Sequence, residues 1–171
     1  MEKLKVLIDE QTIQNKVKEL AQIIEEDYKE QELTLVCILK GSTPFTVDLA
    51  RNINKKVKIE FLQVSSYGAE KISSGKINLK LDLTRNVEGE NLLIVEDIID
   101  TGITLTYLKK HLEEKNPASV KICTLLDKPE RRKSEVKVDY VGFQIPDKFV
   151  VGYGLDYDEI YRNLPYIAEI V

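Results

Sequence analysis

The stretch that decides the fold is Leu92-Leu93-Ile94-Val95-Glu96-Asp97-Ile98-Ile99-Asp100-Thr101-Gly102-Ile103-Thr104. Its four leading apolar residues predict a central buried strand over residues 91–96. Two adjacent carboxylates follow, and an Asp-Thr-Gly-x-Thr turn then leads into a helix marked by Leu105, Leu108 and Leu112. A strand, a polar turn and a helix in this order are typical of an α/β protein.

The polar turn has the groups that bind a phosphate monoester. Its hydroxyls, its glycine and the following helix N-terminus present O–H and N–H donors and a partial positive charge. The carboxylates of Glu96 and Asp97 are suited to accept from two sugar hydroxyls, or to hold Mg²⁺ through its waters. Alternatively, they merely end the strand and Thr104 caps the helix. Two like charges at the end of an apolar strand favour the functional interpretation.

Helices and strands alternate on both sides of this stretch. Asp9 is the predicted N-cap of a helix with apolar residues at Ile13, Val17, Leu20, Ala21, Ile24 and Tyr28. A second helix is expected with Thr43 as its N-cap and Pro44 as its first residue. Further strands are expected over residues 33–39, from 57 towards 66, and over 78–83, 120–126, 138–143 and 150–153. This order predicts an open α/β sheet, largely parallel at its centre and flanked by helices.

Three segments follow the carboxyl ends of the predicted strands. They are Lys40-Gly41-Ser42, residues 97–104 and the loop after Leu126. Ligands of open α/β sheets lie beyond the carboxyl ends of the strands. We therefore expect the ligand site at these three segments.

Composition excludes several classes of protein. The chain has 171 residues, enough for one domain, and 25 Lys and Arg against 29 Asp and Glu give a net charge of −4. This balance argues against a nucleic-acid partner, and the short apolar runs and polar N-terminus argue against a membrane span or secretory signal. Cys37 and Cys123 are expected to be buried reduced thiols of a cytoplasmic protein. With a single histidine, His111, a metal cage built from histidines is excluded.

Five ordered motifs resemble those of one enzyme family and together cover nearly the whole chain. Residues 95–102, Val-Glu-Asp-Ile-Ile-Asp-Thr-Gly, resemble the phosphoribosyl-pyrophosphate signature of the type I phosphoribosyltransferases, in the version typical of the hypoxanthine-guanine branch. Leu39-Lys40-Gly41 resembles the family's pyrophosphate loop, and residues 65–68 resemble the start of its catalytic lid. Lys128-Pro129 with Arg131 and Arg132 resembles the purine-recognition loop. Residues 149–157 and 161–165 resemble the C-terminal hood.

The resemblance implies roles around phosphoribosyl pyrophosphate. Glu96 and Asp97 would address the ribose hydroxyls, directly or through Mg²⁺, and Asp156 would help to hold a second Mg²⁺. Asp100 would face N7 of the purine as general base or acid, unless it only forms the turn. The implied set of residues binding phosphoribosyl pyrophosphate is Lys40, Gly41, Glu96, Asp97, Ile98, Ile99, Asp100, Thr101, Gly102, Thr104 and Arg162. Within it, residues 100–104 would hold the 5′-phosphate, while Lys40, Gly41 and Arg162 would meet pyrophosphate.

The resemblance also implies a purine site and a lid. Lys128 would donate to the 6-oxo group, although a solvated surface lysine is the ordinary alternative. Phe149 would stack on the base, although a phenylalanine taken alone is more often plain core. Val150 would act through its backbone carbonyl, and Asp156 belongs to the same implied set. Ser66 and Tyr67 would start the lid.

The implied fold is the type I phosphoribosyltransferase fold, one domain over residues 1–171 with a small hood subdomain from the N-terminal and C-terminal segments. The implied activity is purine salvage. Hypoxanthine or guanine would receive the 5-phosphoribosyl group at N9, giving IMP or GMP and pyrophosphate, in a homodimer or homotetramer. One alternative is a preference for xanthine. Another is a nucleotide-sensing regulator that binds RNA or DNA, which the net charge and the absence of an added DNA-binding motif in the sequence disfavour.

Overall fold

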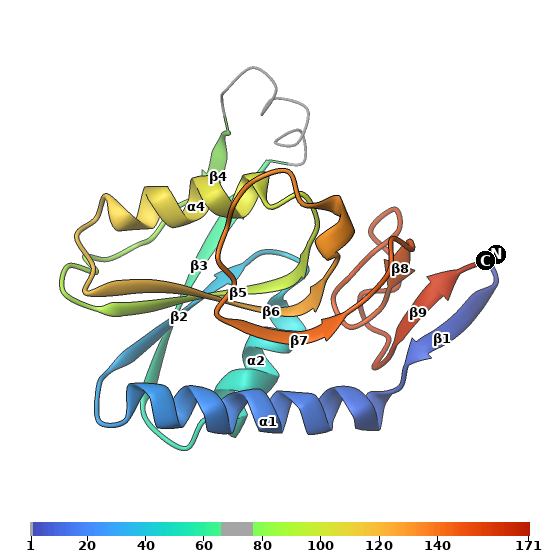
Figure 1. The fold of residues 1–171 in the computed structure, drawn as a ribbon, viewed down its shortest axis with the longest axis horizontal. Coiled ribbons are helices and arrows are strands. Elements are labelled where there is room, and N and C mark those ends of the chain that lie inside the picture. Colours follow the sequence, from blue (N-terminus) through green and yellow to red (C-terminus); the bar gives the residue numbers. More distant parts are fainter. Residues whose placement is uncertain (1, 66–76) are drawn as a thin grey trace.

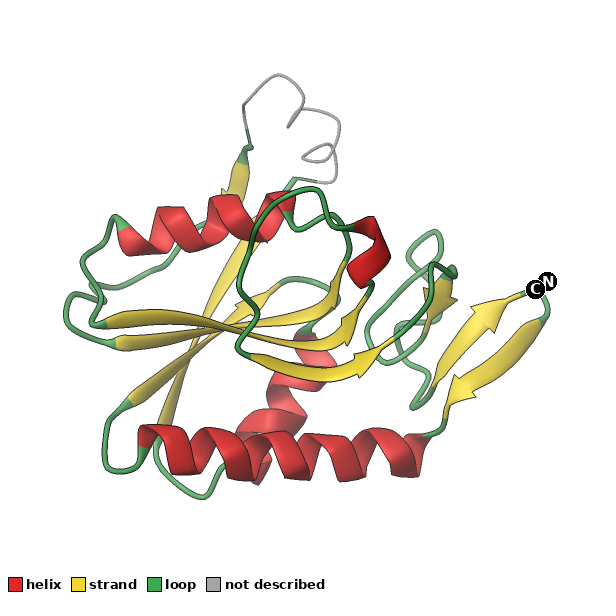
Figure 2. Ribbon diagram, viewed as in Figure 1, coloured by secondary structure: helices red, strands yellow, loops and turns green. Residues whose placement is uncertain are grey.

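The computed structural model describes residues 2–65 and 77–171, whose strands form two sheets (Figures 1 and 2). The larger sheet has the strand order β4-β3-β2-β5-β6-β7, and the smaller sheet has the order β1-β9-β8. The strands are β1 Leu4–Ile8, β2 Leu33–Ile38, β3 Val57–Val64, β4 Leu79–Leu81, β5 Asn91–Ile99, β6 Ser119–Asp127, β7 Tyr140–Gln144, β8 Val150–Val151 and β9 Ile167–Ile170. The helices are α1 Glu10–Tyr28, α2 Thr43–Asn52, α4 Ile103–Glu113 and the short 3₁₀ helix η2 Pro129–Arg131.

The centre of the larger sheet is parallel, which confirms the predicted α/β class. Strand β2 pairs in parallel with β3 and with β5, and β6 pairs in parallel with β5 and with β7. Only the short β4 runs antiparallel to its neighbour β3, within the described residues. Parallel pairing brings the carboxyl ends of β2, β5 and β6 to one edge of the sheet, where the site lies.

Helices cover the two faces of this sheet, with α1 and α2 on one face and α4 on the other (Figure 1). Because alternate strand residues point to opposite faces, Leu33 and Leu35 of β2 pack with α1 and α2, while Val36 and Ile38 pack with α4. All six residues of β2 are buried. An apolar strand covered on both sides is the expected outcome for the interior of a parallel sheet.

Helix α1 begins as predicted, because Asp9 Oδ1 accepts a hydrogen bond from Thr12 N at 2.8 Å. The predicted start of α2 is wrong by one residue. Ser42 holds the cap position, Thr43 is the first helical residue and Pro44 the second. The Thr43 hydroxyl donates to Lys40 O at 2.7 Å, so it closes the preceding turn instead of capping the helix.

Strand β5 continues three residues beyond its predicted end. Pairing with β6 persists through Ile98 with Leu126 and Ile99 with Asp127, so Glu96 and Asp97 lie inside the strand. Their side chains therefore have fixed directions set by the pleat of the sheet.

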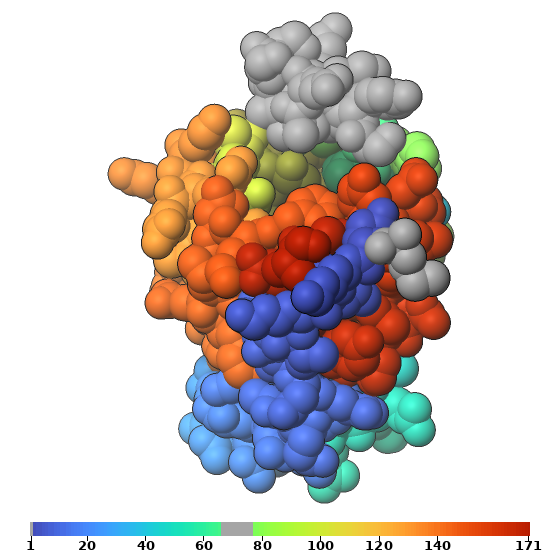
Figure 3. Space-filling view, turned by 90° about the vertical axis from the view of Figure 1, so that its right-hand side faces the viewer, coloured from blue at the N-terminus to red at the C-terminus, as the bar shows by residue number. Residues whose placement is uncertain are grey.

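The smaller sheet joins the two ends of the chain. Strand β1 pairs antiparallel with β9, Leu4 opposite Ile170, and β8 pairs with the other side of β9. The two termini accordingly lie side by side (Figure 1), and the blue and red segments meet on the face shown in Figure 3. Neither β1 nor β9 was predicted, because each is a short segment whose pairing partner is at the far end of the sequence. No helix of residues 2–65 and 77–171 has the length and apolar character needed to cross a bilayer.

Candidate active site

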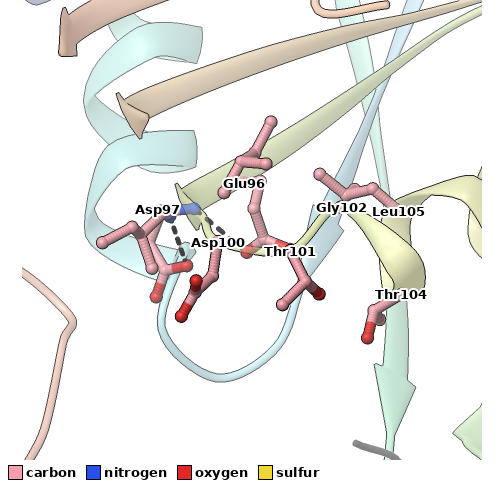
Figure 4. A pocket seen from close by; sticks show the side chains of 9 residues that line it. Glu96, Asp97, Asp100, Thr101, Gly102, Thr104 and Leu105 are labelled. Atoms are coloured by element: carbon pink, nitrogen blue, oxygen red, sulfur yellow. Dashed lines mark hydrogen bonds between the residues drawn. The ribbon is translucent and has the colours of Figure 1, made fainter. Parts of the chain in front are cut away.

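A pocket of about 190 Å³ lies where β5 ends and α4 begins. Its lining consists of Glu96, Asp97, Ile98, Ile99, Asp100, Thr101, Gly102, Thr104 and Leu105. Figure 4 shows these side chains gathered around the turn that links strand and helix. The stretch singled out in the sequence therefore forms a cavity of its own.

The turn between β5 and α4 exposes the N-terminus of the helix to this pocket. Gly102 has φ +82°, and a Cβ there would lie 2.9 Å from both Ser134 Oγ and Val136 Cγ1. Lys133 N donates to Thr101 O at 2.8 Å, which fixes the turn against the loop after β6. The first N–H groups of α4 have no acceptor within their own helix, and Ile103 N makes only a long 3.4 Å bond to Thr101 Oγ1, so an anion in the pocket could accept from this helix end.

The carboxylates of Glu96 and Asp97 are half-buried neighbours. Glu96 Oε1 accepts from Asp97 N at 3.0 Å and Asp97 Oδ1 accepts from Ile98 N at 2.6 Å, both drawn in Figure 4. Burial and the adjacent Asp97 charge raise the pKa of Glu96 well above its usual range, and burial raises the pKa of Asp97. Two carboxylates that repel each other in this way form a site that a cation would stabilise.

The donor set fits Mg²⁺ better than a metal that needs a complete protein cage. Among the described residues, no group of three or more His, Cys, Asp or Glu side chains is arranged to hold a metal. Mg²⁺ characteristically uses one or two carboxylates together with waters and substrate phosphates. The paired carboxylates match that requirement.

A second cluster of charged side chains joins the turn after β2 to the segment after β8. Lys40 Nζ lies 2.7 Å from Glu159 Oε2, and Arg162 Nη2 lies 2.9 Å from Glu159 Oε1 and 3.3 Å from Asp156 Oδ1. Lys40 and Arg162 lower the pKa of Glu159. Arg162 Nε is buried and has no hydrogen-bond partner among the described residues. The cluster therefore holds two cations with a donor left for another acceptor.

The turn after β2 touches the carboxylate pair. The peptide bond between Leu39 and Lys40 is cis. A Cβ on Gly41 would lie 1.9 Å from Asp97 Oδ2, so a larger residue between this turn and β5 would force the Asp97 carboxylate to move. Asp156, in contrast, pairs with Arg162 and is placed with the second cluster rather than in the pocket beside Glu96 and Asp97.

A third cluster follows β6. Lys128 is 8% exposed, hence buried rather than solvated, and its Nζ lies 3.4 Å from Asp147 Oδ1. Arg131 links Asp147, at 3.1 Å, to the carboxylate of Asp100. Lys128 N donates to Ile99 O at 2.9 Å, which holds this loop against the end of β5. The structure thus brings Lys128 and Asp100 to the same edge.

The aromatic side chain proposed to stack on a base is solvent-accessible. Phe149 is 56% exposed and packs edge-to-face on Tyr157 at 5.8 Å between ring centroids, so it is not core. Val150 is buried in β8. Ser66 and Tyr67 lie outside the described residues.

Sequence reasoning missed the carboxylates that organise the two cationic clusters. Glu159 joins Lys40 to Arg162, and Asp147 joins Lys128 to Arg131. Both are ordinary surface residue types, and apart from Arg162, three residues after Glu159, their partners lie 16 or more residues away in sequence. For Glu159, the one available signal is its position between the two hood motifs, residues 149–157 and 161–165.

Comparison with known proteins gives one consistent answer. The sequence profile of the phosphoribosyl transferase domain matches residues 6–158. Over 164 residues, the chain is 50% identical to the hypoxanthine-guanine phosphoribosyltransferase of Bacillus subtilis, covering 96% of this chain and 91% of the relative. The enzyme of the same name from Streptococcus thermophilus is 45% identical over equal coverage. A crystal structure of the hypoxanthine-guanine phosphoribosyltransferase of Bacillus anthracis superposes with a TM-score of 0.95 at 50% identity, covering 100% of both chains.

Proposed function

The chain belongs to the phosphoribosyltransferase family, and we propose that it transfers the 5-phosphoribosyl group of phosphoribosyl pyrophosphate to N9 of hypoxanthine or guanine. The products are IMP or GMP and pyrophosphate. One observation carries this proposal. A glycine-containing turn before the N-terminus of α4, a carboxylate pair and a buried lysine lie at the carboxyl edge of one parallel sheet.

The 5′-phosphate is assigned to the turn between β5 and α4. The N–H groups of the first turn of α4 and the hydroxyls of Thr101 and Thr104 are its donors, while Gly102 lets the backbone approach closely. Ile98 and Ile99 bring the chain to this position from β5. The helix dipole adds a favourable field for the phosphate charge.

Mg²⁺ is assigned to Glu96 and Asp97, next to the ribose hydroxyls, and Asp156 to a second ion. When bound, Mg²⁺ neutralises the charge that develops on the departing pyrophosphate. Asp156 would hold this second ion with the carboxylate that contacts Arg162 at 3.3 Å.

The leaving group is assigned to Lys40, the backbone at Gly41, and Arg162. The planar guanidinium of Arg162 suits a phosphate oxygen, and its buried Nε, which has no acceptor in residues 2–65 and 77–171, supports the assignment. Glu159 accepts from both cations, so its carboxylate would compete with pyrophosphate for Lys40 and Arg162.

The base is assigned to the cluster after β6. Lys128 donates to the 6-oxo oxygen, Phe149 stacks on the ring, and the Val150 carbonyl accepts from the base. Asp100 exchanges the proton at N7, and Arg131 contacts only the Oδ1 atom of its carboxylate. The ribose then carries positive charge in the transition state, and enclosure of the reacting carbon keeps water away. The lid role of Ser66 and Tyr67 is part of the same proposal.

Three broader assignments accompany the activity. The chain acts as one domain, with the β1-β9-β8 sheet and residues 152–165 forming the hood beside the site. Self-association as a dimer or tetramer is supported by Ile59 and Phe61, 38% and 39% exposed on the same face of β3. A cytoplasmic location is supported by two free, buried cysteines.

The test is a spectrophotometric assay with phosphoribosyl pyrophosphate, Mg²⁺ and each of hypoxanthine, guanine, xanthine and adenine. We expect turnover of hypoxanthine and guanine. Turnover of xanthine above both would establish the xanthine preference instead, and turnover of none would reject the activity. Lys133→Ala is a matched control for Lys128 variants, because Lys133 is an exposed lysine in the same loop.

A further inference from the structure

A buried tyrosine joins α2 to the loop that follows β8. Tyr153 is 5% exposed, and its hydroxyl donates to Asp48 Oδ2 on α2. Gln14 Nε2 of α1 donates to the same oxygen at 3.1 Å. Burial and the Asp48 carboxylate raise the pKa of Tyr153, so the hydroxyl remains a donor throughout the neutral range.

Each member of this pair is next to one of the two segments assigned to pyrophosphate. Asp48 is on α2, which begins directly after the Lys40-Gly41-Ser42 turn. Tyr153 directly precedes Gly154, whose carbonyl accepts from Arg162 Nη1 at 2.7 Å. The hydrogen bond between Asp48 and Tyr153 therefore connects α2, which follows the Lys40-Gly41-Ser42 turn, with the loop that leads to Arg162.

The two segments assigned to pyrophosphate touch through their backbones at Gly41 and Gly154. Gly154 has φ +100°, and a Cβ there would lie 1.9 Å from Gly41 O and 2.9 Å from Pro44 Cδ. The backbone conformation of Tyr153, at φ +48°, is also one that non-glycine residues rarely adopt. Such a conformation persists only where surrounding contacts hold it. Two hydrogen bonds hold Tyr153: its backbone N donates to Leu164 O at 2.8 Å, and its hydroxyl donates to Asp48.

We infer that Asp48 and Tyr153 are positioning residues that fix the distance between the Lys40–Gly41 turn and the Gly154–Arg162 loop. They act on pyrophosphate binding through these segments and do not touch the substrate. The inference rests on the proposed function, because it needs pyrophosphate to bridge the two segments. The base site has other supports: Lys128 and Asp100 directly follow β6 and β5, while Phe149 and Val150 are held by backbone pairing with β9. Loss of the Asp48–Tyr153 pair should therefore spare the base site.

The central experiment compares Tyr153→Phe with Tyr140→Phe. Tyr140 is a matched control, because it is 6% exposed and its hydroxyl donates to another carboxylate, Asp27 Oδ2, at 2.6 Å between β7 and α1. Both variants lose one hydroxyl and should lower Tm. We expect Tyr153→Phe to raise the KM for phosphoribosyl pyrophosphate about tenfold, as for a lost hydrogen bond to a charged acceptor, with a change in hypoxanthine KM below about twofold. Tyr140→Phe should leave both KM values unchanged.

Two Asp48 variants separate positioning from bulk stability. Asp48→Ala should raise the same KM about tenfold, and adding Tyr153→Phe to it should cause little further change because the two residues act as one unit. Asp48→Asn keeps an oxygen that accepts from Tyr153 and should recover most of the affinity. The Kd of pyrophosphate with Mg²⁺, measured by calorimetry, should follow the same order.

The inference is overturned if Tyr153→Phe loses stability as Tyr140→Phe does while its KM for phosphoribosyl pyrophosphate stays within about twofold of wild type. It is equally overturned if the hypoxanthine KM rises by the same factor, since that would mark a general effect on the fold. If Asp48→Ala fails to fold, the comparison of the two tyrosine variants decides. A wild-type protein that forms no IMP and binds no pyrophosphate would instead reject the proposed function.

Discussion

Replacement of Lys128 by alanine tests how the base is chosen. In the structure the Lys128 side chain is buried, with its ammonium 3.4 Å from Asp147. A hydrogen bond from a charged donor contributes about 1.5–3 kcal/mol, which corresponds to roughly 10- to 150-fold in kcat/KM for a 6-oxopurine. Lys128→Ala should therefore lower kcat/KM for hypoxanthine by about that factor.

The same substitution should narrow the discrimination against adenine. Adenine presents a 6-amino donor where hypoxanthine presents an acceptor, so the ammonium of Lys128 would face a donor and find no acceptor on this base. A site built for one hydrogen-bonding pattern rejects the mismatched analogue by up to about 10⁴. The assay is steady-state turnover of both bases by wild type, Lys128→Ala and the exposed control Lys133→Ala. Wild-type turnover of adenine within about tenfold of hypoxanthine, or an unchanged hypoxanthine kcat/KM in Lys128→Ala, would refute the reasoning.

Three other substitutions test separate parts of the site. Asp100→Ala should lower kcat by about 10²–10⁴ with little change in binding of phosphoribosyl pyrophosphate, as expected for loss of the proton carrier, and a single-turnover rate within about threefold of wild type would contradict that role. Gly41→Ala should lower both Tm and affinity for phosphoribosyl pyrophosphate, because its Cβ would lie 1.9 Å from Asp97 Oδ2; calorimetry and KM measurements showing neither effect would count against the close approach. Glu96→Gln should raise the Tm of the metal-free protein at pH 7 while lowering activity. The pKa of Glu96 is higher in the folded than in the unfolded protein, so ionisation of Glu96 destabilises the folded state once the pH exceeds the unfolded-state pKa. The gain in Tm from Glu96→Gln should therefore be larger at pH 7 than at pH 4, and the opposite order would contradict the prediction.

Local patterns predicted most of the fold because each element carries its own signal. The continuous apolar run of β2 and the helical spacing after Asp9 required no knowledge of distant contacts. Strand β5 was predicted too short because a carboxylate pair ordinarily ends an apolar strand, whereas pairing with β6 extends it to Ile99. Strands β1 and β9 depend on each other across almost the whole chain, and neither has enough pattern to be recognised alone.

In the candidate site, too, some features could be predicted from local sequence and others depend on contacts between distant segments. The turn at Asp100 to Thr104 is contiguous, so its phosphate-binding character follows from the residues themselves. Burial of Lys128 and the pairing of Lys40 and Arg162 through Glu159 arise from chain segments that meet only in the folded protein. The resemblance to a family identified Lys40, Lys128 and Arg162, but only the structure showed that the carboxylates of Glu159 and Asp147 pair with them.

The most direct test of the central claim is the product balance of one reaction mixture containing the wild-type protein, phosphoribosyl pyrophosphate and hypoxanthine. Chromatography should show equal amounts of IMP and pyrophosphate appearing with Mg²⁺, equal to the hypoxanthine consumed, and no turnover in excess EDTA, because the Glu96 and Asp97 carboxylates and the pyrophosphate charge require a cation. Full turnover in EDTA, or release of pyrophosphate without IMP, would contradict the claim.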